Sequence, residues 1–578
     1  MAIFKNHAAF STVFFYVSAT LFSLFIASPD SYFNDMSPAP APTVAPYDGG
    51  QWVLLHKSIG VSAMHMQLLK NNKVILFDRT DMGPSNATYP PGAVQCRNYT
   101  VRNRTVTDCT PHSLLYDVAS DTFRPLVVKS DTWCSSGAVD PNGTLVQTGG
   151  YGTGIQAIRT FTPCDDDTCQ WVELGVKLLA QRWYATNQIL PDGRVIVVGG
   201  RRAFNYEFYP KADDKSSKLY NMRFLWETKD FYEENNLYPF LHLLPDGNLF
   251  VFANNQSILF DYNNNTVVKK FPAMPGGVKR SYPATGSSVM LPLKMNGVLD
   301  NSGQPEVEIL ICGGSYGGAY YKSNRQKVYI GASASCGRIK LSDPNPNWVM
   351  EEMPLPRVMG DMLLLPNGDV LILNGAANGT AGWEDAINPV LHPVLYKTYE
   401  PDPSRRFVIL NPTTIPRMYH SSCLLLPDGR ILVGGSNPHQ MYNFRRAFPT
   451  ELSLEAYLPP YLSPSSAPLR PTIISIEAEG GNIVSYGQEF SVNFGLSVYR
   501  PGVAITVALV SPSFTTHSLA MNQRVVVLEV ASLKRLSVFD YKITARGPLS
   551  TSVAPPGYYM IFIVHAGVPG QALWVKVQ

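Results

Sequence analysis

One pattern recurs along this chain of 578 residues: apolar residues, then Pro-x-Gly, then a β-rich run that ends in Gly-Gly or a related pair. Weaker copies lie at 70–77 and 307–314, and clear copies start at Pro141, Pro191, Pro245, Pro366 and Pro427. Pro-x-Gly is typical of a tight hairpin turn, and a run rich in β-branched residues indicates a buried strand. Because no sustained helical periodicity competes with this pattern, the sequence predicts an all-β fold.

The spacing of the copies predicts the architecture. Seven copies, roughly 50 to 70 residues apart, match the kelch period of about 50, in which each copy forms one four-stranded blade. We therefore expect a seven-bladed kelch-type β-propeller over residues 48–465. From about Pro468 the repeat stops while strand-like runs continue. This change predicts a β-sandwich domain of the immunoglobulin-like type over residues 466–578.

The charge balance excludes two classes of function. Lys plus Arg number 47 and Asp plus Glu number 44, which gives a net charge of +3. This balance argues against nucleic-acid binding and against a polybasic membrane-binding surface. Charged residues make up 16% of the chain, below the roughly 25% of an average soluble domain, as a stack of buried strands requires.

The first 27 residues have the features of a secretory signal, with Lys5 near the start and an uncharged run from Ala8 to Ala27. An uncleaved membrane anchor is the alternative, because this run approaches the thickness of a bilayer. A Pro/Ala-rich linker follows at 28–47. We expect secretion to the cell exterior or cell wall, with no stable membrane anchor after cleavage.

Glycosylation motifs and cysteines agree with secretion. The chain has seven Asn-x-Ser/Thr sequons, at Asn86, Asn98, Asn103, Asn142, Asn255, Asn264 and Asn378. Six of the eight cysteines lie close together in pairs that polar residues flank. In an oxidising compartment this proximity predicts the disulfides Cys96–Cys109, Cys164–Cys169 and Cys312–Cys336.

Equivalent positions of successive blades converge on the axial channel of a propeller. Seven positions before the Pro of each clear copy stand Cys134, Tyr184, Tyr238, Met359 and His420, with Tyr419 beside the last. For any one of them, a large side chain that fills the channel is the better interpretation. Together, a thiol, phenols and an imidazole favour a site, since imidazole and phenolate ligands suit Cu(II). A bound dication would also lower the pKa of a phenol from its reference of about 10.

Four motifs in these regions resemble those of the copper-radical oxidases: Asp131-Thr-Trp-Cys134, Arg182-Trp-Tyr184, Arg417-Met-Tyr-His420 and Thr515-Thr-His-Ser-Leu-Ala-Met-Asn-Gln-Arg524. The similarity runs from about Gly49 to Gln578. It is strongest to the glyoxal oxidases and their plant aldehyde-oxidase relatives, and galactose oxidase is more distant. Arg-x-Tyr alone would carry no information, but the four motifs together are specific.

The resemblance implies one copper ion, bound by Tyr184, Tyr419, His420 and His517. It also implies a thioether bond between Cys134 and Tyr184, so that a protein-derived cysteinyl-tyrosine radical is the second cofactor. His517 would come from a loop that the second domain sends along the propeller axis; without the resemblance, an exposed loop histidine would be the better interpretation. With Cys134 used in this way, Cys423 is expected to be a buried free thiol.

The sequence departs from galactose oxidase at one point. That enzyme stacks a tryptophan over the cross-linked ring, from the segment after the next Gly-Gly. Here Gly199-Gly200 is followed by Arg201-Arg202-Ala203-Phe204. This departure favours the aldehyde-oxidising branch, and it leaves Trp133, Trp183 and Phe204 as alternatives for shielding the radical.

The family reaction implies a role for each residue. Tyr419 accepts a proton from an aldehyde hydrate or primary alcohol as general base, the Tyr184–Cys134 radical takes a hydrogen atom from the substrate carbon, and copper takes the remaining electron. Dioxygen reoxidises the site and leaves as hydrogen peroxide. The expected partners are a small aldehyde of the glyoxal or methylglyoxal type and dioxygen, and the expected state is a monomer that binds no nucleic acid.

Two other functions stay open. The first is a primary-alcohol or galactose-type carbohydrate oxidase. The second is a non-enzymatic kelch binding scaffold of the cell wall, which the fold alone would favour. The set of candidate ligands outweighs the scaffold interpretation.

Overall fold

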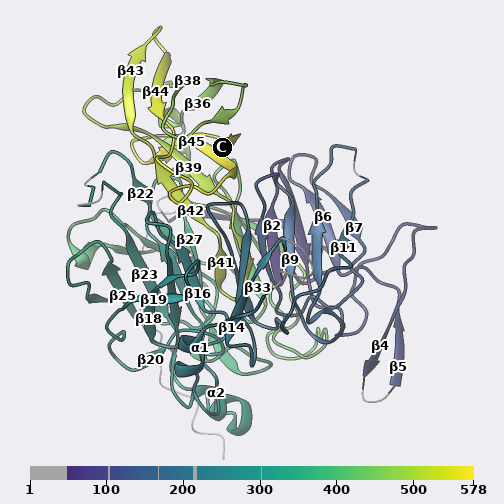
Figure 1. The fold of residues 1–578 in the computed structure, drawn as a ribbon. Coiled ribbons are helices and arrows are strands. Elements are labelled where there is room, and N and C mark those ends of the chain that lie inside the picture. Colours follow the sequence, from purple (N-terminus) through teal and green to yellow (C-terminus); the bar gives the residue numbers. More distant parts are fainter. Residues whose placement is uncertain (1–48, 102–103, 167, 212–217, 298, 301–302) are drawn as a thin grey trace, which may run out of the picture. The chain divides into compact units, whose positions relative to one another are not determined.

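The computed structural model describes residues 49–578 except 102–103, 167, 212–217, 298 and 301–302 (Figure 1). The predicted signal at 1–27, the predicted linker at 28–47 and the sequon residue Asn103 lie outside the described residues. Strands and loops make up almost all of the described chain. The α-helices within it, α1 (Arg223–Glu227) and α2 (Ala319–Tyr321), are one turn long or less.

Between residues 51 and 458, the described part of the chain forms seven groups of four antiparallel strands. The first four groups are β2 (His65–Leu68), β3 (Lys73–Phe77), β6 (Ser113–Asp117) and β7 (Thr122–Leu126); β8 (Ser136–Val139), β9 (Leu145–Thr148), β10 (Ile158–Phe161) and β11 (Val172–Glu173); β12 (Ala185–Ile189), β13 (Val195–Gly199), β14 (Asn205–Tyr209) and β15 (Tyr220–Asn221); and β16 (Phe240–Leu243), β17 (Leu249–Ala253), β18 (Gln256–Asp261) and β19 (Thr266–Lys270).

The remaining three groups are β21 (Gly286–Met290), β23 (Glu308–Gly313), β25 (Ser335–Lys340) and β26 (Trp348–Glu352); β27 (Asp361–Leu364), β28 (Val370–Leu373), β31 (Val394–Tyr396) and β32 (Phe407–Ile409); and β33 (Ser421–Leu425), β34 (Ile431–Gly435), β35 (Leu454–Leu458) and β1 (Gln51–His56). Three two-stranded sheets of the described region lie outside these groups: β4 (Arg97–Val101) with β5 (Arg104–Asp108), β20 (Val278–Lys279) with β24 (Ser315–Tyr316), and β29 (Ala376–Gly379) with β30 (Ala386–Pro389).

Burial falls from the first strand of a group to the last. The first strand β12 is buried at every position, whereas the fourth strand β19 is exposed at every position. The first strands of different groups also contact one another: β33 contacts β2, β8 contacts β12, and β27 contacts β33. The strand nearest the N-terminus, β1, completes the last group by pairing with β35. This gradient is the one that a propeller requires, because its inner strands line the axis.

The Pro-x-Gly elements form the predicted hairpin turns. Between β12 and β13, the Leu190 N–H donates to the Arg194 carbonyl at 2.8 Å and closes a loop over Pro191, Asp192 and Gly193. Gly193 has φ +81, as a type I turn followed by a left-handed residue requires. The glycines of the other four clear copies share this positive φ, so each copy repeats one turn geometry.

In four of the groups, a buried arginine bonds the segment before the first strand to the end of the second strand. Four fully buried arginines precede first strands, and the Nη1 group of each donates to the carbonyl at the end of the second strand of the same group: Arg182 to Gly199, Arg280 to Gly313, Arg357 to Asn374 and Arg417 to Gly435. Burial lowers the pKa of Arg280 and of Arg357 to about 9, which leaves both charged at neutral pH. Arg182 and Arg417 also bind buried carboxylates, of Glu207 and Glu455, at 2.8 Å.

The C-terminal domain is a sandwich of two sheets (Figure 1). One sheet has the order β36 (Thr472–Glu477), β38 (Glu489–Gly495), β44 (Asp540–Arg546), β43 (Val530–Arg535). The other has the order β22 (Leu293–Lys294), β42 (Arg524–Val527), β39 (Ile505–Ser511), β45 (Gly557–His565), β47 (Leu573–Val577), β37 (Ile483–Val484), with β46 (Val568–Pro569) on β45. β22 comes from the region between β21 and β23 and pairs in parallel with β42, so the N-terminal region adds an edge strand to this sheet of the C-terminal domain.

One hairpin of the C-terminal domain leaves the sandwich and joins the first group of strands. Strands β40 (Phe514–Thr516) and β41 (Leu519–Met521) extend that group to the order β41-β40-β2-β3-β6-β7. β40 pairs antiparallel with β2, with Thr516 opposite His65. The hairpin also contacts β8, β12, β21, β27 and β33, the first strands of five other groups.

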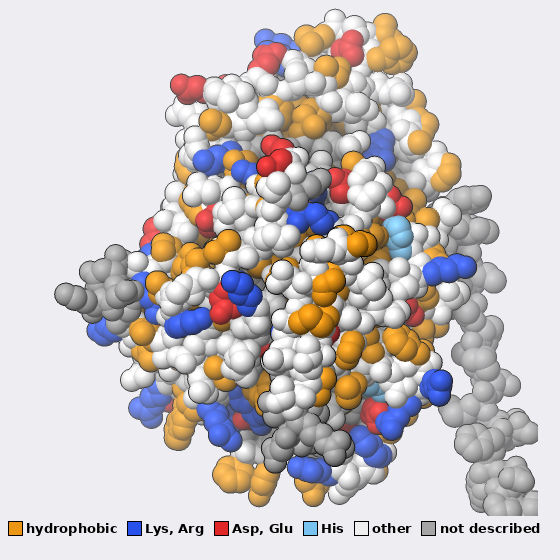
Figure 2. Space-filling model, turned by 90° about the vertical axis from the view of Figure 1, so that its right-hand side faces the viewer, with side chains coloured by type: hydrophobic (Ala, Val, Ile, Leu, Met, Phe, Trp, Pro, Cys, Tyr) orange, Lys and Arg blue, Asp and Glu red, His pale blue; other side chains and the backbone are white. Residues whose placement is uncertain are grey.

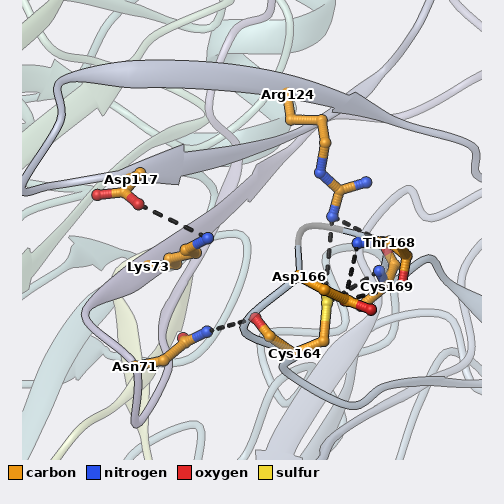
Figure 3. The surroundings of a disulfide bond; sticks show 8 residues. All are labelled: Asn71, Lys73, Asp117, Arg124, Cys164, Asp166, Thr168 and Cys169. Carbon is orange, nitrogen blue, oxygen red and sulfur yellow. Dashed lines mark hydrogen bonds and ion pairs between the residues drawn. A yellow bond between two sulfur atoms is a disulfide. The ribbon is translucent and has the colours of Figure 1, made fainter.

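All three predicted disulfides are present, and Cys134 and Cys423 are buried free thiols. Figure 3 shows how the Cys164–Cys169 loop is held against the first group of strands. The Asn71 side chain donates to the Cys164 carbonyl at 3.2 Å, and the Arg124 guanidinium donates to the Cys169 carbonyl at 2.7 Å. The disulfide therefore stabilises a loop between β10 and β11 of the second group, and this loop is hydrogen-bonded to the first group.

The surface agrees with the composition. On the face that Figure 2 shows, charged side chains of both signs are scattered among hydrophobic and uncharged ones. In the part of the chain that the structure describes, no helix combines the length and the apolar character needed to cross a membrane.

The predicted all-β fold with a C-terminal sandwich is confirmed. The predicted boundary at 465/466 lies within η5 (Pro464–Leu469), a 3-10 turn between β35 and β36. That the seven groups close into one seven-bladed ring stays a prediction, which the four-stranded groups and the contacts between their first strands support.

The Arg417–Glu455 pair provides a test of how much these buried arginines contribute to stability. Replacing Arg417 with Leu should cost about 3–5 kcal/mol of stability, because it leaves a buried carboxylate without its cation. Replacing Arg194, whose pair with Asp192 is exposed, should cost about 1 kcal/mol or less. The shift of the denaturant midpoint measures both, and equal shifts would contradict a special role for the buried pair.

Candidate metal centre

The residues that the repeat count placed at one register lie side by side in the structure. The Tyr184 N–H donates to the Cys134 carbonyl at 3.0 Å, and the Tyr238 N–H donates to the Tyr184 carbonyl at 3.0 Å. In the same way, the Met359 N–H donates to the Thr285 carbonyl at 2.9 Å. Thr285 is the equivalent position of the fifth group, which the Pro-x-Gly count missed because that group lacks a clear copy.

These positions share an unusual backbone conformation. Cys134, Tyr184, Tyr238, Met359 and His420 have φ between +48 and +67. For a residue other than glycine, this left-handed conformation costs about 1–3 kcal/mol and occurs mostly where structure or function demands it. Because Met359, which is no candidate ligand, shares this conformation, the conformation belongs to the chain segment that enters the first strand and not to the function of one residue. The backbone therefore fixes where the side chain lies, and the residue type decides which chemical group is placed there.

The C-terminal hairpin brings a histidine to the same place. His517 and Ser518 form the two-residue turn between β40 and β41, and their φ values are +47 and +68. Positive φ at both positions is the type I′ geometry, in which Asn-Gly is usual. A His-Ser turn therefore pays a conformational cost to place the His517 ring at its tip.

The residues after the hairpin hold it in register. Asn522 accepts from the Ile189 N–H at 2.7 Å, and Gln523 accepts from the Leu364 N–H at 3.0 Å. Arg524 donates to the Leu243 carbonyl. The Asn-Gln-Arg part of the fourth motif thus attaches the second domain to the first strands of three different groups, and so positions His517.

Five side chains with donor atoms surround one point. The Cys134 thiol lies 3.2 Å from Nε2 of His517, and the His420 and His517 rings are 4.8 Å apart between centroids. One ligand atom each from Cys134, His420 and His517 can be chosen so that all three lie within 4.8 Å of one another. The Tyr419 ring stacks on His420 at 3.8 Å, and the Tyr184 ring stands edge-on to His517 at 6.2 Å.

Burial makes this cluster neutral. It raises the pKa of the Tyr184 and Tyr419 phenols and of the Cys134 thiol well above their usual ranges. It also lowers the pKa of the two imidazoles, His420 and His517, well below the usual range. At neutral pH both imidazoles therefore keep a lone pair that a metal ion can use.

His420 carries the clearest sign of a missing partner. The residue is 1% exposed, and neither of its ring nitrogens has a hydrogen-bond partner among the described residues. Such a buried polar group costs about 1–3 kcal/mol per unsatisfied atom. Nδ1 of His517, by contrast, contacts the Thr516 hydroxyl at 2.6 Å, which orients its Nε2 toward Cys134. A divalent ion among these side chains would bind one of the two His420 nitrogens.

Aromatic side chains cover the Tyr184 ring. Trp183 lies at 4.7 Å from it, tilted by 33°, and Tyr282 stacks on it at 4.5 Å with an angle of 29°. Arg201, the residue directly after Gly199-Gly200, places its guanidinium 5.2 Å from the centre of the Trp183 ring. Phe204 packs against a different hydrophobic cluster, around Tyr206 and Phe224. Of the three alternatives from the sequence, Trp183 is in direct contact with Tyr184.

Two residues near the cluster were missed by the sequence analysis. The Tyr282 hydroxyl lies within hydrogen-bond distance of the hydroxyls of both Tyr184 and Tyr419. Tyr282 belongs to Arg280-Ser-Tyr282, which shares the Arg-x-Tyr pattern of the other two tyrosines. Arg79 is 2% exposed, binds Asp81 through two nitrogens and lies 3.8 Å from the centre of the Trp133 ring. The repeated Arg-x-Tyr could have pointed to Tyr282, whereas no repeat marks Arg79.

The sequons differ in exposure. Asn86, Asn98, Asn142 and Asn264 are exposed, and Asn255 and Asn378 are half-buried. The Asn378 side chain also donates to the Tyr329 carbonyl at 3.5 Å and accepts from Asn388 at 3.0 Å. Glycosylation stays a prediction, and at Asn378 these contacts occupy the side-chain amide to which a glycan would be attached.

Comparison with known protein families gives two matches that follow each other along the chain. The glyoxal oxidase N-terminus family matches residues 64–461, and the galactose oxidase-like early set domain matches residues 470–577.

Relatives match most of the chain. Aldehyde oxidase GLOX1 of Arabidopsis thaliana is 43% identical over 532 residues, which are 91% of this chain and 84% of that protein. Aldehyde oxidase GLOX of Vitis pseudoreticulata is 43% identical over 531 residues, which are 91% of this chain and 97% of that protein. Galactose oxidase of Gibberella zeae is 24% identical over 466 residues, which are 78% of this chain and 61% of that protein.

A solved structure shares the fold. It is a fungal alcohol oxidase of the AA5 family in complex with copper, with a TM-score of 0.67, 19% identity, and coverage of 92% of this chain and 100% of that one. At this identity the similarity concerns the fold alone. The family match over more than half of the chain and the plant relatives at 43% identity show that this chain belongs to the glyoxal oxidase family.

Proposed function

We propose that this protein is a secreted copper-radical oxidase that converts small aldehydes of the glyoxal and methylglyoxal type to carboxylic acids and reduces dioxygen to hydrogen peroxide. The observation that carries the proposal is the buried cluster of two phenols, two imidazoles and a thiol, in which His420 has two unsatisfied nitrogens. Family membership and relatives named aldehyde oxidases support the choice of substrate.

Tyr184, Tyr419, His420 and His517 would hold the copper ion. Imidazole and phenolate are ligands that suit Cu(II), and two phenolates would balance the two charges of the ion. This balance matters because an isolated charge in so buried a site is strongly unfavourable. When bound, copper supplies an open position for the substrate oxygen and accepts one of the two electrons that the substrate gives up.

The protein side chains divide the remaining work. Oη of Tyr419 accepts the proton of the substrate hydroxyl, which requires a separation of about 3 Å. Oη of Tyr184, cross-linked to Cys134, accepts the hydrogen atom from the substrate carbon. An aldehyde hydrate thereby loses two protons and two electrons to become the acid, and dioxygen gains the same to become hydrogen peroxide.

Trp183 is the residue that shields the radical. It covers the Tyr184 ring directly and is in turn covered by the guanidinium of Arg201. Arg201 belongs to the segment after Gly199-Gly200, the segment from which galactose oxidase supplies its stacking tryptophan. The aromatic cover of the Tyr184 ring thus comes from Trp183, the residue directly before Tyr184. Arg201, directly after Gly199-Gly200, contributes a cation over the Trp183 ring.

Secretion rests on several features together: the signal-like first 27 residues, the sequons and the three disulfides. A protein that releases hydrogen peroxide outside the cell, or into the cell wall, fits this combination. The monomeric state stays a prediction.

Oxygen uptake tests the function itself. The copper-loaded protein should consume dioxygen with methylglyoxal and form one hydrogen peroxide per acid, and galactose should give a rate lower by about tenfold or more, equivalent to 1.4 kcal/mol. A higher rate on galactose would replace the aldehyde assignment with the carbohydrate one. No uptake with any aldehyde or alcohol by a copper-loaded protein would favour the binding scaffold.

Copper content tests the ligands. His420→Ala and His517→Ala should each reduce the copper bound per chain after dialysis, because each removes one nitrogen donor. The control is His242→Gln, since His242 is also a buried histidine but bonds to the Ser288 hydroxyl at 2.8 Å, away from the cluster. Metal analysis by mass spectrometry measures all three variants, and unchanged copper in His517→Ala would remove that residue from the ligand set.

Cysteine variants test the radical. Cys134→Ser and Tyr184→Phe should abolish hydrogen peroxide production, because either change prevents formation of the cysteinyl-tyrosine. Cys423→Ser is the matched control: Cys423 is the other buried free thiol and lies outside the cluster, near Asp361. Peroxide assays on folded, copper-loaded protein give the comparison, and full activity in Cys134→Ser would refute the assignment.

The intact mass distinguishes a cross-link from a different use of the same thiol. After reduction of the disulfides, a Cys134–Tyr184 bond leaves the chain two hydrogens lighter than its sequence. Cys423→Ser should keep this deficit, and Cys134→Ser should lose it. A chain without the deficit that still binds copper would make Cys134 a direct metal ligand beside His420 and His517, which the geometry of the three donor atoms also allows.

A further inference from the structure

Three Arg-x-Tyr segments of this chain end at the same place. Tyr184 and Tyr419 belong to two of them, and Tyr282 belongs to the third, Arg280-Ser-Tyr282. In each case the arginine is buried and bonds to the end of the second strand of its group, which fixes the segment that leads to the tyrosine. The repeat therefore delivers three phenols to the centre, one more than the proposed ligand set uses.

Tyr282 lies between the other two. Its hydroxyl oxygen is 2.8 Å from that of Tyr419 and 3.2 Å from that of Tyr184. Its ring stacks on Tyr184 at 4.5 Å and stands edge-on to His517 at 5.8 Å. The residue is 8% exposed, and its N–H donates to the Leu237 carbonyl at 3.2 Å, so the backbone holds the ring in place.

A phenol hydroxyl has one proton to donate, so Tyr282 can donate a hydrogen bond to only one of its two neighbours at a time. When Tyr184 and Tyr419 are both phenols, the three hydroxyls form a chain in which each can donate to the next. When both are phenolates, the one remaining proton is on Tyr282 and can be donated to only one oxygen. The shorter distance selects Tyr419, and a hydrogen bond to an anion is stronger than one between neutral groups.

We propose that Tyr282 is a positioning residue that couples the base to the redox-active phenol, an inference that rests on the proposed function. While Tyr419 is a phenolate, the Tyr282 hydroxyl donates to it and holds its oxygen in place. Once Tyr419 has taken the substrate proton, it donates to Tyr282 instead. The Tyr282 hydroxyl is then released to donate to Oη of Tyr184, which in the proposed reaction accepts the hydrogen atom from the substrate carbon.

Tyr238 shows what a purely packing tyrosine looks like here. It is fully buried and contacts the Tyr184 ring edge-on at 5.5 Å. Its hydroxyl, however, donates to the Ser135 carbonyl at 2.9 Å, outside the trio of phenol oxygens. Removing this hydroxyl deletes a buried hydrogen bond near Tyr184 without touching Tyr419, which makes Tyr238→Phe the matched control for Tyr282→Phe.

The experiment compares these two variants and the wild type as copper-loaded, oxidised protein. Tyr282→Phe should bind copper as the wild type does, lower kcat by about tenfold or more for the loss of one hydrogen bond to an ionised group, and change KM much less. It should also shift the visible absorption bands and the midpoint potential of the oxidised site. Tyr238→Phe should leave kcat, absorption and potential unchanged.

The outcomes separate this inference from the proposed function. A wild-type protein that binds copper but develops no absorption from the oxidised site would refute the radical assignment, whatever Tyr282 does. A wild type with these bands, together with a Tyr282→Phe variant of unchanged spectrum, potential and kcat, would refute the role of Tyr282. Equal effects of Tyr282→Phe and Tyr238→Phe would reduce Tyr282 to a packing residue.

Discussion

The antiparallel pairing of β40 with β2 is the interaction on which the candidate site depends. The first strands of the groups leave backbone donors and acceptors along the centre, and a hairpin from the second domain uses those of β2 to add a strand. The pairing puts the turn His517–Ser518 among the entries of the first strands. Asn522, Gln523 and Arg524 then bond to three other groups, so the position of His517 is fixed by both domains.

The physical state of the site follows from this depth of burial. Once the hairpin is in place, the two phenols, the two imidazoles and the thiol are cut off from water, and all are neutral at neutral pH. A dication that displaces two phenol protons keeps the site neutral overall, whereas an ion without such ligands would bring an unbalanced charge into it. Burial therefore favours a dication whose charge two ionised side chains balance, and the unsatisfied nitrogens of His420 are donors that such an ion could use.

Most of the fold was open to prediction from the sequence because each group repeats one local rule. Pro-x-Gly forces the same turn, and the runs after it are apolar because the second strands are buried on both faces. The positions Cys134, Tyr184 and His420 could be predicted by counting back from that turn. Thr285 was missed because its group has no clear Pro-x-Gly. Arg79 was missed because it follows β3, where no repeated feature marks it, and its place beside Trp133 depends on contacts between groups. His517 was predictable only through resemblance, since nothing in Thr515-Thr-His-Ser shows that the hairpin turns inward.

The repeated entry into the first strand explains how a structural scaffold acquires chemistry. A left-handed residue and a buried arginine hold the entry in the same conformation whether the side chain at the centre is Met359, Tyr184 or His420. Because the backbone is fixed independently of the side chain, exchanging that side chain alters the central cluster with little effect on the strands. Six such entries thus offer a choice of donors at close range: Cys134, Tyr184, Tyr238, Thr285, Met359 and His420. In this chain the choice includes three Arg-x-Tyr segments, and the third phenol, Tyr282, lies where its single proton can be donated to either Tyr419 or Tyr184.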